Sequence, residues 1–265
     1  MAKFTYTVIK DKADKRDRIV APSTVVIPPS YTLPEVASIP VKNQGQEGSC
    51  TANAGSVLRE FLRRKYFQWE TDKTDAQTIE LSAQFLYWVE RLIEGTTNED
   101  NGVQSRTIFK ALLQYGVCPE SEDPYEDTGW GTSPPIKCFP DGLKFTIGAY
   151  HRIPNFLALK ASIASGYPAT MGINVYESFE SDQVASSGMV PVPGPNEQLL
   201  GGHEIFAFGY SDTQVINTSQ GTWTGGILCR NSWGEDWGIK GDFWMPYAFE
   251  PNVMDIWMGH LGKPW

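Results

Sequence analysis

The clearest hydrophobic pattern in the chain begins just after residue 50. Apolar side chains recur there three and four residues apart, which is the spacing of one buried face of a helix. These residues are Ala54, Val57, Leu58, Phe61 and Leu62. Gly48 and Ser49 stand immediately before the run, where a tight turn and an N-cap would lie. We predict a helix from Cys50 to about Tyr66, with Cys50 in the first turn, where free backbone N–H groups and the helix dipole favour an anion.

Two further helices are predicted in the first half of the chain. One covers residues 78–94, where Ser82 can serve as N-cap, and the other covers residues 104–115. A glycine follows each of them, as is common at helix ends. The stretch 126–140 is rich in Gly, Pro and Ser and is predicted to be loop.

The second half of the chain is mostly β in character. Segments of strand length that are apolar, or that alternate between apolar and polar, occur at residues 144–150, 168–175, 204–210, 226–231 and 242–245. One short helix is predicted at residues 155–164, with Asn155 as its cap, and a loop at residues 191–200 leads to His203. We therefore expect an α+β protein, with helices first, a sheet second and a boundary near residue 140.

The composition narrows the classes of function. The 265 residues are enough for one large domain or for two lobes that share a cleft. The net charge of −9 argues against non-specific binding to nucleic acid or to anionic membranes. No apolar run approaches the ~20 residues of a membrane-spanning helix, and the charged N-terminus lacks the apolar core of a signal peptide. We expect a cytoplasmic or non-classically exported protein that binds neither nucleic acid nor membrane.

The four cysteines fall into two groups. If Cys50 is a nucleophile, Cys118, Cys138 and Cys229 remain, and three thiols cannot all pair. Without a signal peptide we expect reduced, buried thiols, with a disulfide between Cys118 and Cys138 as the open alternative. No Cys-x-x-Cys motif and no cluster of Cys and His suggests zinc, so we expect neither a metal nor another cofactor.

Three segments, in order along the chain, resemble those of the papain-like cysteine peptidases, the family of papain and the cathepsins. Residues 42–54, Lys-Asn-Gln-Gly-Gln-Glu-Gly-Ser-Cys-Thr-Ala-Asn-Ala, resemble the segment that carries the nucleophilic cysteine. Residues 201–205, Gly-Gly-His-Glu-Ile, resemble the histidine segment, and residues 231–238, Asn-Ser-Trp-Gly-Glu-Asp-Trp-Gly, resemble the asparagine segment. The separation between Cys50 and His203 is also close to that of papain-type enzymes.

The resemblance implies a papain-like α+β fold of two lobes with an active-site cleft between them. The helical lobe, with its central helix from the cysteine, would take up about residues 42–140. The β-barrel-like lobe would take up about residues 141–250 together with residues 30–41. The peptidase domain would then be residues 30–265. Residues 1–29 would be an extension, either a flexible solvated tail or a short prosegment in the cleft, as in some bacterial members.

The candidate catalytic residues have two kinds of role, which are proton transfer and stabilisation of charge. A thiol with a pKa of about 8.5 needs a shift of roughly 2 units, about 2.7 kcal/mol, to be mostly thiolate at neutral pH. A helix dipole supplies only about 0.3–1 kcal/mol, so an imidazolium must supply the rest, and His203 is the candidate for it. By resemblance, Asn231 orients His203, while the backbone N–H of Cys50 and the side-chain amide of Gln44 bind the oxyanion.

The resemblance also implies substrate-binding residues. Gly102 lies in a loop similar to the family's Asn-Gly-Gly loop, whose backbone pairs with bound peptide, although Val103 replaces the second glycine. Trp233 would cover the hydrogen bond between histidine and asparagine, and Trp237 would line the leaving-group side. Glu204 stands where a small apolar residue is usual, and strand alternation predicts that its side chain points away from the histidine ring.

We predict a cysteine endopeptidase that hydrolyses peptide or protein substrates through a thioacyl-enzyme on Cys50. An exopeptidase or an acyl transferase at the same site is the first alternative. For an exopeptidase, the N-terminal extension or residues 259–265 would block one end of the cleft. A catalytically silent binding module is the second alternative, although all four catalytic positions are filled. The P2 pocket is left open, with Met171 and residues 253–257 as candidates for its lining.

Overall fold

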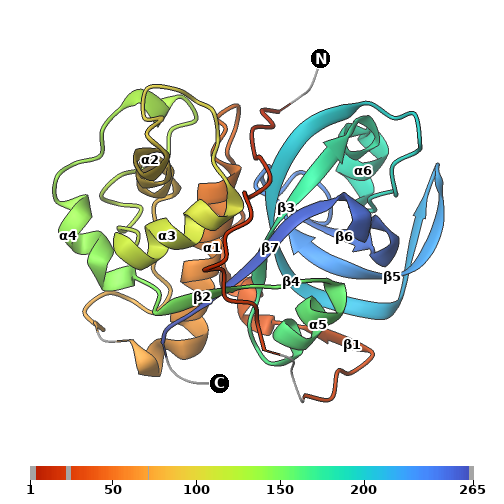
Figure 1. The fold of residues 1–265 in the computed structure, drawn as a ribbon, viewed down its shortest axis with the longest axis horizontal. Coiled ribbons are helices and arrows are strands. Elements are labelled where there is room, and N and C mark those ends of the chain that lie inside the picture. Colours follow the sequence, from red (N-terminus) through yellow and green to blue (C-terminus); the bar gives the residue numbers. More distant parts are fainter. Residues whose placement is uncertain (1–3, 22–24, 71, 263–265) are drawn as a thin grey trace.

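The computed structural model describes residues 4–21, 25–70 and 72–262. Within them the chain forms two lobes side by side, one helical and one built around a sheet (Figure 1). The helical lobe contains α1 (Cys50–Tyr66), α2 (Ala83–Glu94), α3 (Ser105–Gln114) and the short α4 (Cys138–Gly142). The predicted α+β class with two lobes is confirmed.

Antiparallel strands form the second lobe. In the described residues they make one seven-stranded sheet in the order β2-β7-β3-β4-β5-β6, with β1 paired to β4. The strands are β1 (Ser30–Thr32), β2 (Ala149–Arg152), β3 (Ala169–Tyr176), β4 (Leu199–Thr218), β5 (Gly221–Arg230), β6 (Asp242–Pro246) and β7 (Val253–His260). This lobe also contains α5 (Phe156–Ala164) and α6 (Asp182–Ser187). The sheet is not closed, because β2 and β6 are its opposite edges.

Short 3-10 turns connect several of these elements. They span Pro34–Ser38, Phe67–Trp69, Gly129–Gly131, Leu143–Phe145, Glu177–Glu180 and Tyr247–Asn252.

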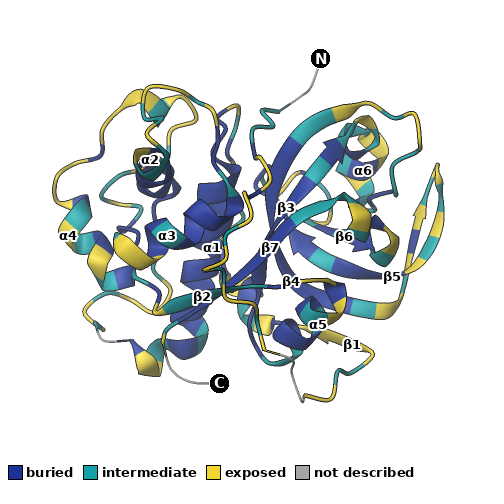
Figure 2. Cartoon of the chain, viewed as in Figure 1, coloured by how far each residue is buried: buried dark blue, intermediate teal, exposed yellow. Residues whose placement is uncertain are grey.

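Helix α1 is buried almost completely. All its residues except Lys65 are buried, and the helix is dark blue along its length in Figure 2. It packs against α2 and α3 on one side and against β4 on the other. Elements of both lobes therefore cover the helix, which places α1 at the junction of the two lobes.

The arginines of α1 are buried inside the protein. Arg59 makes two parallel hydrogen bonds to the Glu70 carboxylate, of 2.7 and 2.8 Å. Arg63 donates to three backbone carbonyls, those of Asp72, Asp75 and Ala76. Arg63 lies in the last turn, where a cation suits the helix dipole. The contacts of both arginines also fasten the chain that follows α1.

Some predicted boundaries differ from the structure. Helix α2 begins at Ala83 and not at residue 78, because Ser82 occupies the N-cap and accepts a 2.9 Å hydrogen bond from the Phe85 N–H. The strand expected at residues 144–150 begins only at Ala149, because a 3-10 turn precedes it. Strand β7 was not predicted, since Asp255 interrupts its apolar run.

The N-terminal segment crosses the junction of the two lobes and is the red trace in Figure 1. Its far end lies along β2, where the Val20 N–H donates to the Arg152 carbonyl at 2.9 Å. Its N-terminal part lies along β4, where the Val8 N–H donates to the Gly202 carbonyl at 3.1 Å. Residues 4–20 are thus docked on the protein and do not extend freely into solvent, whereas residues 1–3 and 22–24 lie outside the described residues.

Candidate active site

Cys50 is the first residue of α1, and it is fully buried. Ser49 lies at the N-cap position, but its hydroxyl does not cap the helix, so the predicted side-chain cap is not formed. The Ser49 hydroxyl instead lies 2.6 Å from the Tyr125 hydroxyl, and the Asn53 amide donates to the Ser49 carbonyl at 2.9 Å. The turn before the thiol is therefore held by two side chains that the sequence did not indicate.

His203 and Asn231 are joined by a hydrogen bond that defines the state of the imidazole. His203 lies within β4, Asn231 follows β5, and His203 Nε2 is 2.8 Å from Asn231 Oδ1. The Ser232 backbone N–H donates to the same Oδ1 at 2.8 Å, which identifies that atom as the acceptor oxygen. Nε2 must therefore carry a hydrogen, and Nδ1 is the free nitrogen of the neutral ring. Within the described part of the chain, Nδ1 is buried and has no hydrogen-bond partner.

The thiol lies against the strand that carries His203. Burial raises the pKa of Cys50 to about 12, while the backbone N–H groups of Glu204 and Thr51 act in the opposite direction. Burial likewise lowers the pKa of His203 to about 4, although its hydrogen bond to Asn231 raises it. Each group is therefore neutral when it is considered alone, because an isolated charge is unfavourable in this buried site.

Gln44 is tied to the asparagine segment from the opposite side of the junction. The Ser232 hydroxyl donates to Gln44 Oε1 at 2.6 Å, and the Gln44 backbone N–H donates to the Ser232 carbonyl at 2.9 Å. Gln44 Nε2 donates one hydrogen bond to the Glu47 carbonyl, at 2.9 Å. A primary amide has two N–H donors, so one remains for another acceptor at this position.

Two tryptophans surround the histidine–asparagine pair. The Trp233 ring stacks on the His203 ring, with centroids 5.0 Å apart and an interplanar angle of 29°. Trp237 meets Trp233 edge to face, at 5.1 Å and 86°. Both tryptophans are buried, and the first of them screens the imidazole from water.

Residues 4–8 lie directly on this group of side chains. Phe4 stacks on Trp233 at 4.0 Å, and Tyr6 meets the His203 ring edge to face at 6.0 Å. The Tyr6 hydroxyl donates to Glu180 Oε1 at 2.6 Å. These contacts cover the candidate site with the protein's own N-terminal segment.

Gly102 and Gly202 allow the N-terminal segment to approach closely. A Cβ atom at Gly102 would lie 2.1 Å from Thr7 Oγ1, and one at Gly202 would lie 1.9 Å from the Val8 carbonyl oxygen. Gly102 also has a φ of 60°, which favours glycine, and its N–H donates to the Tyr87 hydroxyl at 3.1 Å. The loop that the sequence singled out for peptide binding is thus in contact with a peptide segment of the same chain.

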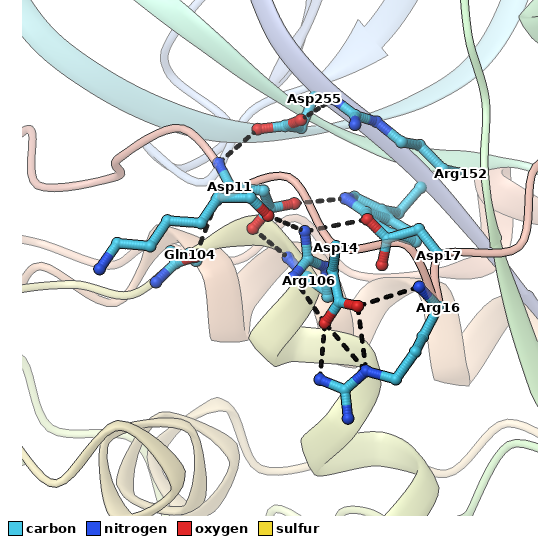
Figure 3. A network of polar contacts seen from close by, with 10 residues as sticks. Asp11, Asp14, Arg16, Asp17, Gln104, Arg106, Arg152 and Asp255 are labelled. Atoms are coloured by element: carbon cyan, nitrogen blue, oxygen red, sulfur yellow. Dashed lines mark hydrogen bonds and ion pairs between the residues drawn. The ribbon is translucent and has the colours of Figure 1, made fainter.

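A charged network anchors the continuation of the segment (Figure 3). The Asp11 N–H donates to Asp255 Oδ2 at 2.7 Å, and the Asp11 carboxylate accepts from the Arg106 N–H at 3.2 Å and from Trp257 Nε1 at 2.7 Å. Arg106 also pairs with Asp17 at 3.0 Å. Since Arg106 belongs to α3 and Asp255 to β7, the segment is fastened to both lobes at once.

Glu204, Met171 and the start of the C-terminal tail each have a defined place in the fold. The Glu204 side chain points away from the histidine ring, as alternation predicted, and accepts from the Ser105 hydroxyl at 2.6 Å. Met171 is buried in β3 opposite Ile256 of β7, within the core of the sheet. Of the tail at 259–265, the first two residues belong to β7 and pair with β2, and residues 263–265 lie outside the described residues.

The sequence did not single out Phe4, Tyr6 or Tyr125. A signal was present for the first two, because Phe-Thr-Tyr-Thr-Val at residues 4–8 alternates in the manner of an extended strand. Tyr125 had no such signal. Among the described residues, no helix combines the length and the apolar character needed to span a bilayer.

The family model of the papain family cysteine proteases matches residues 30–256. The chain belongs to this family. It is therefore a cysteine peptidase, a hydrolase that acts on peptide or protein substrates.

Relatives in the family come from bacteria, viruses and animals. The structure of xylellain, a cysteine protease from Xylella fastidiosa, is 32% identical, covers 98% of this chain and 97% of that chain, and gives a TM-score of 0.84. An uncharacterised peptidase C1-like protein of Acanthamoeba polyphaga mimivirus is 30% identical over 94% of this chain and 85% of its own length. Cathepsin K of Gallus gallus is 29% identical over 76% of this chain, which spans about half of that relative's length (53%).

Proposed function

We propose that this peptidase is an endopeptidase that hydrolyses peptide bonds through a thioacyl-enzyme on Cys50. The observation that carries the proposal is the His203–Asn231 pair, in which Oδ1 holds Nε2 at 2.8 Å and leaves Nδ1 free. Nδ1 is then the nitrogen that accepts the thiol proton. Because each group resists a charge alone, the active form is the pair in which one proton has moved from Sγ to Nδ1.

The proposed reaction uses these polar groups in turn. The thiolate attacks the peptide carbonyl, and the oxyanion that forms accepts from the Cys50 backbone N–H and the second amide hydrogen of Gln44. Nδ1–H of His203 protonates the departing amine. The same nitrogen next takes a proton from water, which hydrolyses the thioester and frees the thiol. Asn231 keeps the ring in one orientation throughout.

An endopeptidase needs a cleft that is open at both ends, and the path of residues 4–17 supports this mode. The segment contacts Trp233 at one end and continues past His203 to Gly102 and then to Arg106. A chain can therefore enter and leave on either side of the histidine. Gly102, Trp233 and Trp237 remain the proposed substrate-binding residues. The N-terminal segment contacts Gly102 and Trp233, and Trp237 packs against Trp233.

We also infer that residues 4–17 keep the enzyme inactive until they are displaced or removed. Tyr6 and Phe4 lie over the imidazole and its covering tryptophan, so a substrate must replace them before its carbonyl can reach the thiol. The pairing of Arg106 with Asp17 would hold the segment in place. Deletion of residues 4–20 should raise activity on a small peptide, and an unchanged rate would contradict this role.

Labelling by a thiol-directed epoxide tests the nucleophile. Cys50 should be modified in the wild-type protein, faster after deletion of residues 4–20, and not at all in Cys50→Ala. Cys229→Ala is the matched control, since Cys229 is a buried free thiol of β5 outside the site. Labelling that survives Cys50→Ala, or its absence from both the intact and the truncated protein, would refute the proposal and favour a silent binding module.

Cleavage of peptides of graded length distinguishes an endopeptidase from an exopeptidase or an acyl transferase. An endopeptidase cleaves internal bonds in peptides blocked at both ends, whereas an exopeptidase requires one free end. Transfer of the acyl group to an added amine in preference to water would instead identify an acyl transferase.

A further inference from the structure

We propose that Cys118 and Cys138 form a redox dithiol, with Glu122 as its proton acceptor, and that oxidation of the pair fastens the loop that supports the catalytic turn. The two sulfurs and a Glu122 carboxylate oxygen all lie within 4.8 Å of one another. Both thiols are free, and neither takes part in the proposed peptide hydrolysis. The dithiol itself does not depend on that proposal.

Both thiols are carried by backbone that is already fixed. The Cys118 carbonyl accepts from the Ser82 N–H at 2.9 Å, and the Cys138 N–H donates to the Pro135 carbonyl at 2.9 Å. The two backbones also pack tightly beside the thiols, because a Cβ at Gly116 would lie 1.9 Å from the Gly142 carbonyl oxygen. Backbone packing therefore brings the sulfurs together before any bond forms between them.

Glu122 supplies the base that such a pair needs. Within the described residues its Oε2 atom is buried without a hydrogen-bond partner, and burial raises the pKa of this carboxyl. Burial also raises the pKa of the Cys118 and Cys138 thiols. A thiol that does not ionise readily must pass its proton to a nearby group before it can attack a disulfide, and a Glu122 carboxylate oxygen lies within 4.8 Å of both sulfurs.

A small disulfide such as oxidised glutathione completes the reaction. Cys138 passes its proton to Glu122 and attacks one sulfur of the small disulfide, which gives a mixed disulfide. The glutathione thiolate that leaves takes up that proton and is released as a thiol. Cys118 then passes its proton to Glu122 and attacks the Cys138 sulfur, and the second glutathione leaves with that proton. The protein loses two hydrogens and is oxidised, while one glutathione disulfide is reduced to two thiols. Cys118 and Cys138 are both buried, so the first attack requires a local opening of the chain around Cys138, where Ile136 is 88% exposed.

The donor set favours a dithiol over a metal site. A structural zinc site is closed by four ligands, and the described residues offer three here. Both sulfurs would also have to be ionised, in a setting that raises the pKa of each. Zinc binding is therefore an outcome that the test must distinguish, and not the proposal.

The loop between the two cysteines reaches the catalytic turn. The Tyr125 hydroxyl donates to the Gln44 carbonyl at 2.8 Å and lies 2.6 Å from the Ser49 hydroxyl. Asp127 packs against Gly45, where a Cβ would lie 2.5 Å from Asp127 Oδ2. A disulfide would close residues 119–137 into a ring and restrict the unfolded chain, which stabilises this support.

Oxidation of the Cys50→Ala protein tests the dithiol without interference from the nucleophile. After treatment with oxidised glutathione, we expect a loss of two hydrogen masses and a cross-linked Cys118–Cys138 peptide. The Tm should rise by roughly 6–10 °C relative to the reduced protein. Further substitution of Cys118→Ala should abolish these changes, and Cys229→Ala should preserve them. Stable mixed disulfides alone, or a Tm that does not change, would overturn the proposal and leave the peptidase proposal untouched.

Two further measurements examine the base and the metal alternative. Glu122→Gln should slow the conversion of the mixed disulfide by tenfold or more, whereas Glu126→Gln, an exposed carboxylate in the same loop, should not. Equal rates for the two variants would remove Glu122 from the scheme. Titration of the reduced protein with zinc chloride should show no tight site, and stoichiometric binding that Cys118→Ala abolishes would make this a metal site instead.

Discussion

The rings of Phe4 and Trp233 lie parallel, with an interplanar angle of 4° and centroids 4.0 Å apart. Trp233 in turn stacks on His203. A residue at the start of the chain therefore completes a stack of three rings that ends on the proposed catalytic base. Access of a substrate to His203 therefore depends on the stability of the contact between Phe4 and Trp233.

Removal of the two covering rings should activate the enzyme. In Phe4→Ala/Tyr6→Ala the stack on Trp233 and the contact with His203 are both lost, and aromatic pairs contribute about 0.5–1.5 kcal/mol each beyond their buried area. We expect kcat/KM for a short blocked peptide to rise roughly 5-fold or more. Ile9→Ala is the control, since Ile9 belongs to the same segment but is 58% exposed. An equal effect of both changes would show that the rings do not block the site.

Loss of the Gln44 amide should lower kcat. Gln44→Ala removes a proposed oxyanion donor, and such losses cost about 10²–10³ in kcat with less effect on KM. Gln46→Ala removes an exposed amide of the same turn and should leave kcat within about twofold. Steady-state assays of kcat and KM for both variants test this prediction, and thermal melts check that both variants are folded. A change confined to KM would argue that Gln44 binds substrate and does not stabilise the oxyanion.

The buried carboxyl of Glu204 should make the protein less stable as the pH rises. Burial raises its pKa from 4.5 to about 8 in the folded state, whereas the unfolded chain ionises near the usual value. Between these two pH values the folded state binds more protons, so the free energy of unfolding falls with increasing pH.

Replacement of this carboxyl tests the linkage. In Glu204→Gln the decrease in unfolding free energy should be shallower by up to ~1.4 kcal/mol per pH unit over the same range. Urea unfolding at several pH values measures this slope. Glu177→Gln, an exposed carboxylate, should retain the wild-type slope. Identical slopes for Glu204→Gln and wild type would mean that Glu204 is ionised in the folded protein.

Removal of one partner of the buried ion pair between Arg59 and Glu70 should strongly lower the free energy of unfolding. Arg59→Met leaves the Glu70 carboxylate without its two hydrogen bonds, and a buried charge that loses its partner costs about 3–5 kcal/mol. Arg16→Met breaks the exposed pair with Asp14 and should cause no measurable change. Denaturant midpoints of the two variants make the comparison, and similar midpoints would contradict a structural role for Arg59.

Local sequence signals were sufficient for α1 and for the placement of the candidate residues. Helical periodicity after residue 50 predicted both ends of α1, because a buried helix repeats its apolar side chains at a fixed spacing. The glycine, histidine and asparagine segments are contiguous motifs, so each candidate could be named without knowledge of its neighbours. The capping of Ser82 and Asn155 was likewise confirmed, since a cap acts over three residues.

Local signals failed where a distant group competed for the same atom. Ser49 stands at an N-cap position, but its hydroxyl contacts Tyr125 and does not cap α1. Asp255 breaks the apolar pattern of β7, yet the strand forms because Asp11 and Arg152 satisfy the carboxylate. Neither partner is near in sequence, so no local pattern could reveal it.

The sequence alone was therefore enough to predict the class of fold and to propose which side chains act in catalysis, because periodicity and short motifs are properties of neighbouring residues. The tertiary structure alone decided that residues 4–8 lie over the imidazole and that Cys118 meets Cys138. Such contacts join segments far apart along the chain. These contacts depend on how distant segments pack together, and the residues next to each position in the sequence do not specify that packing.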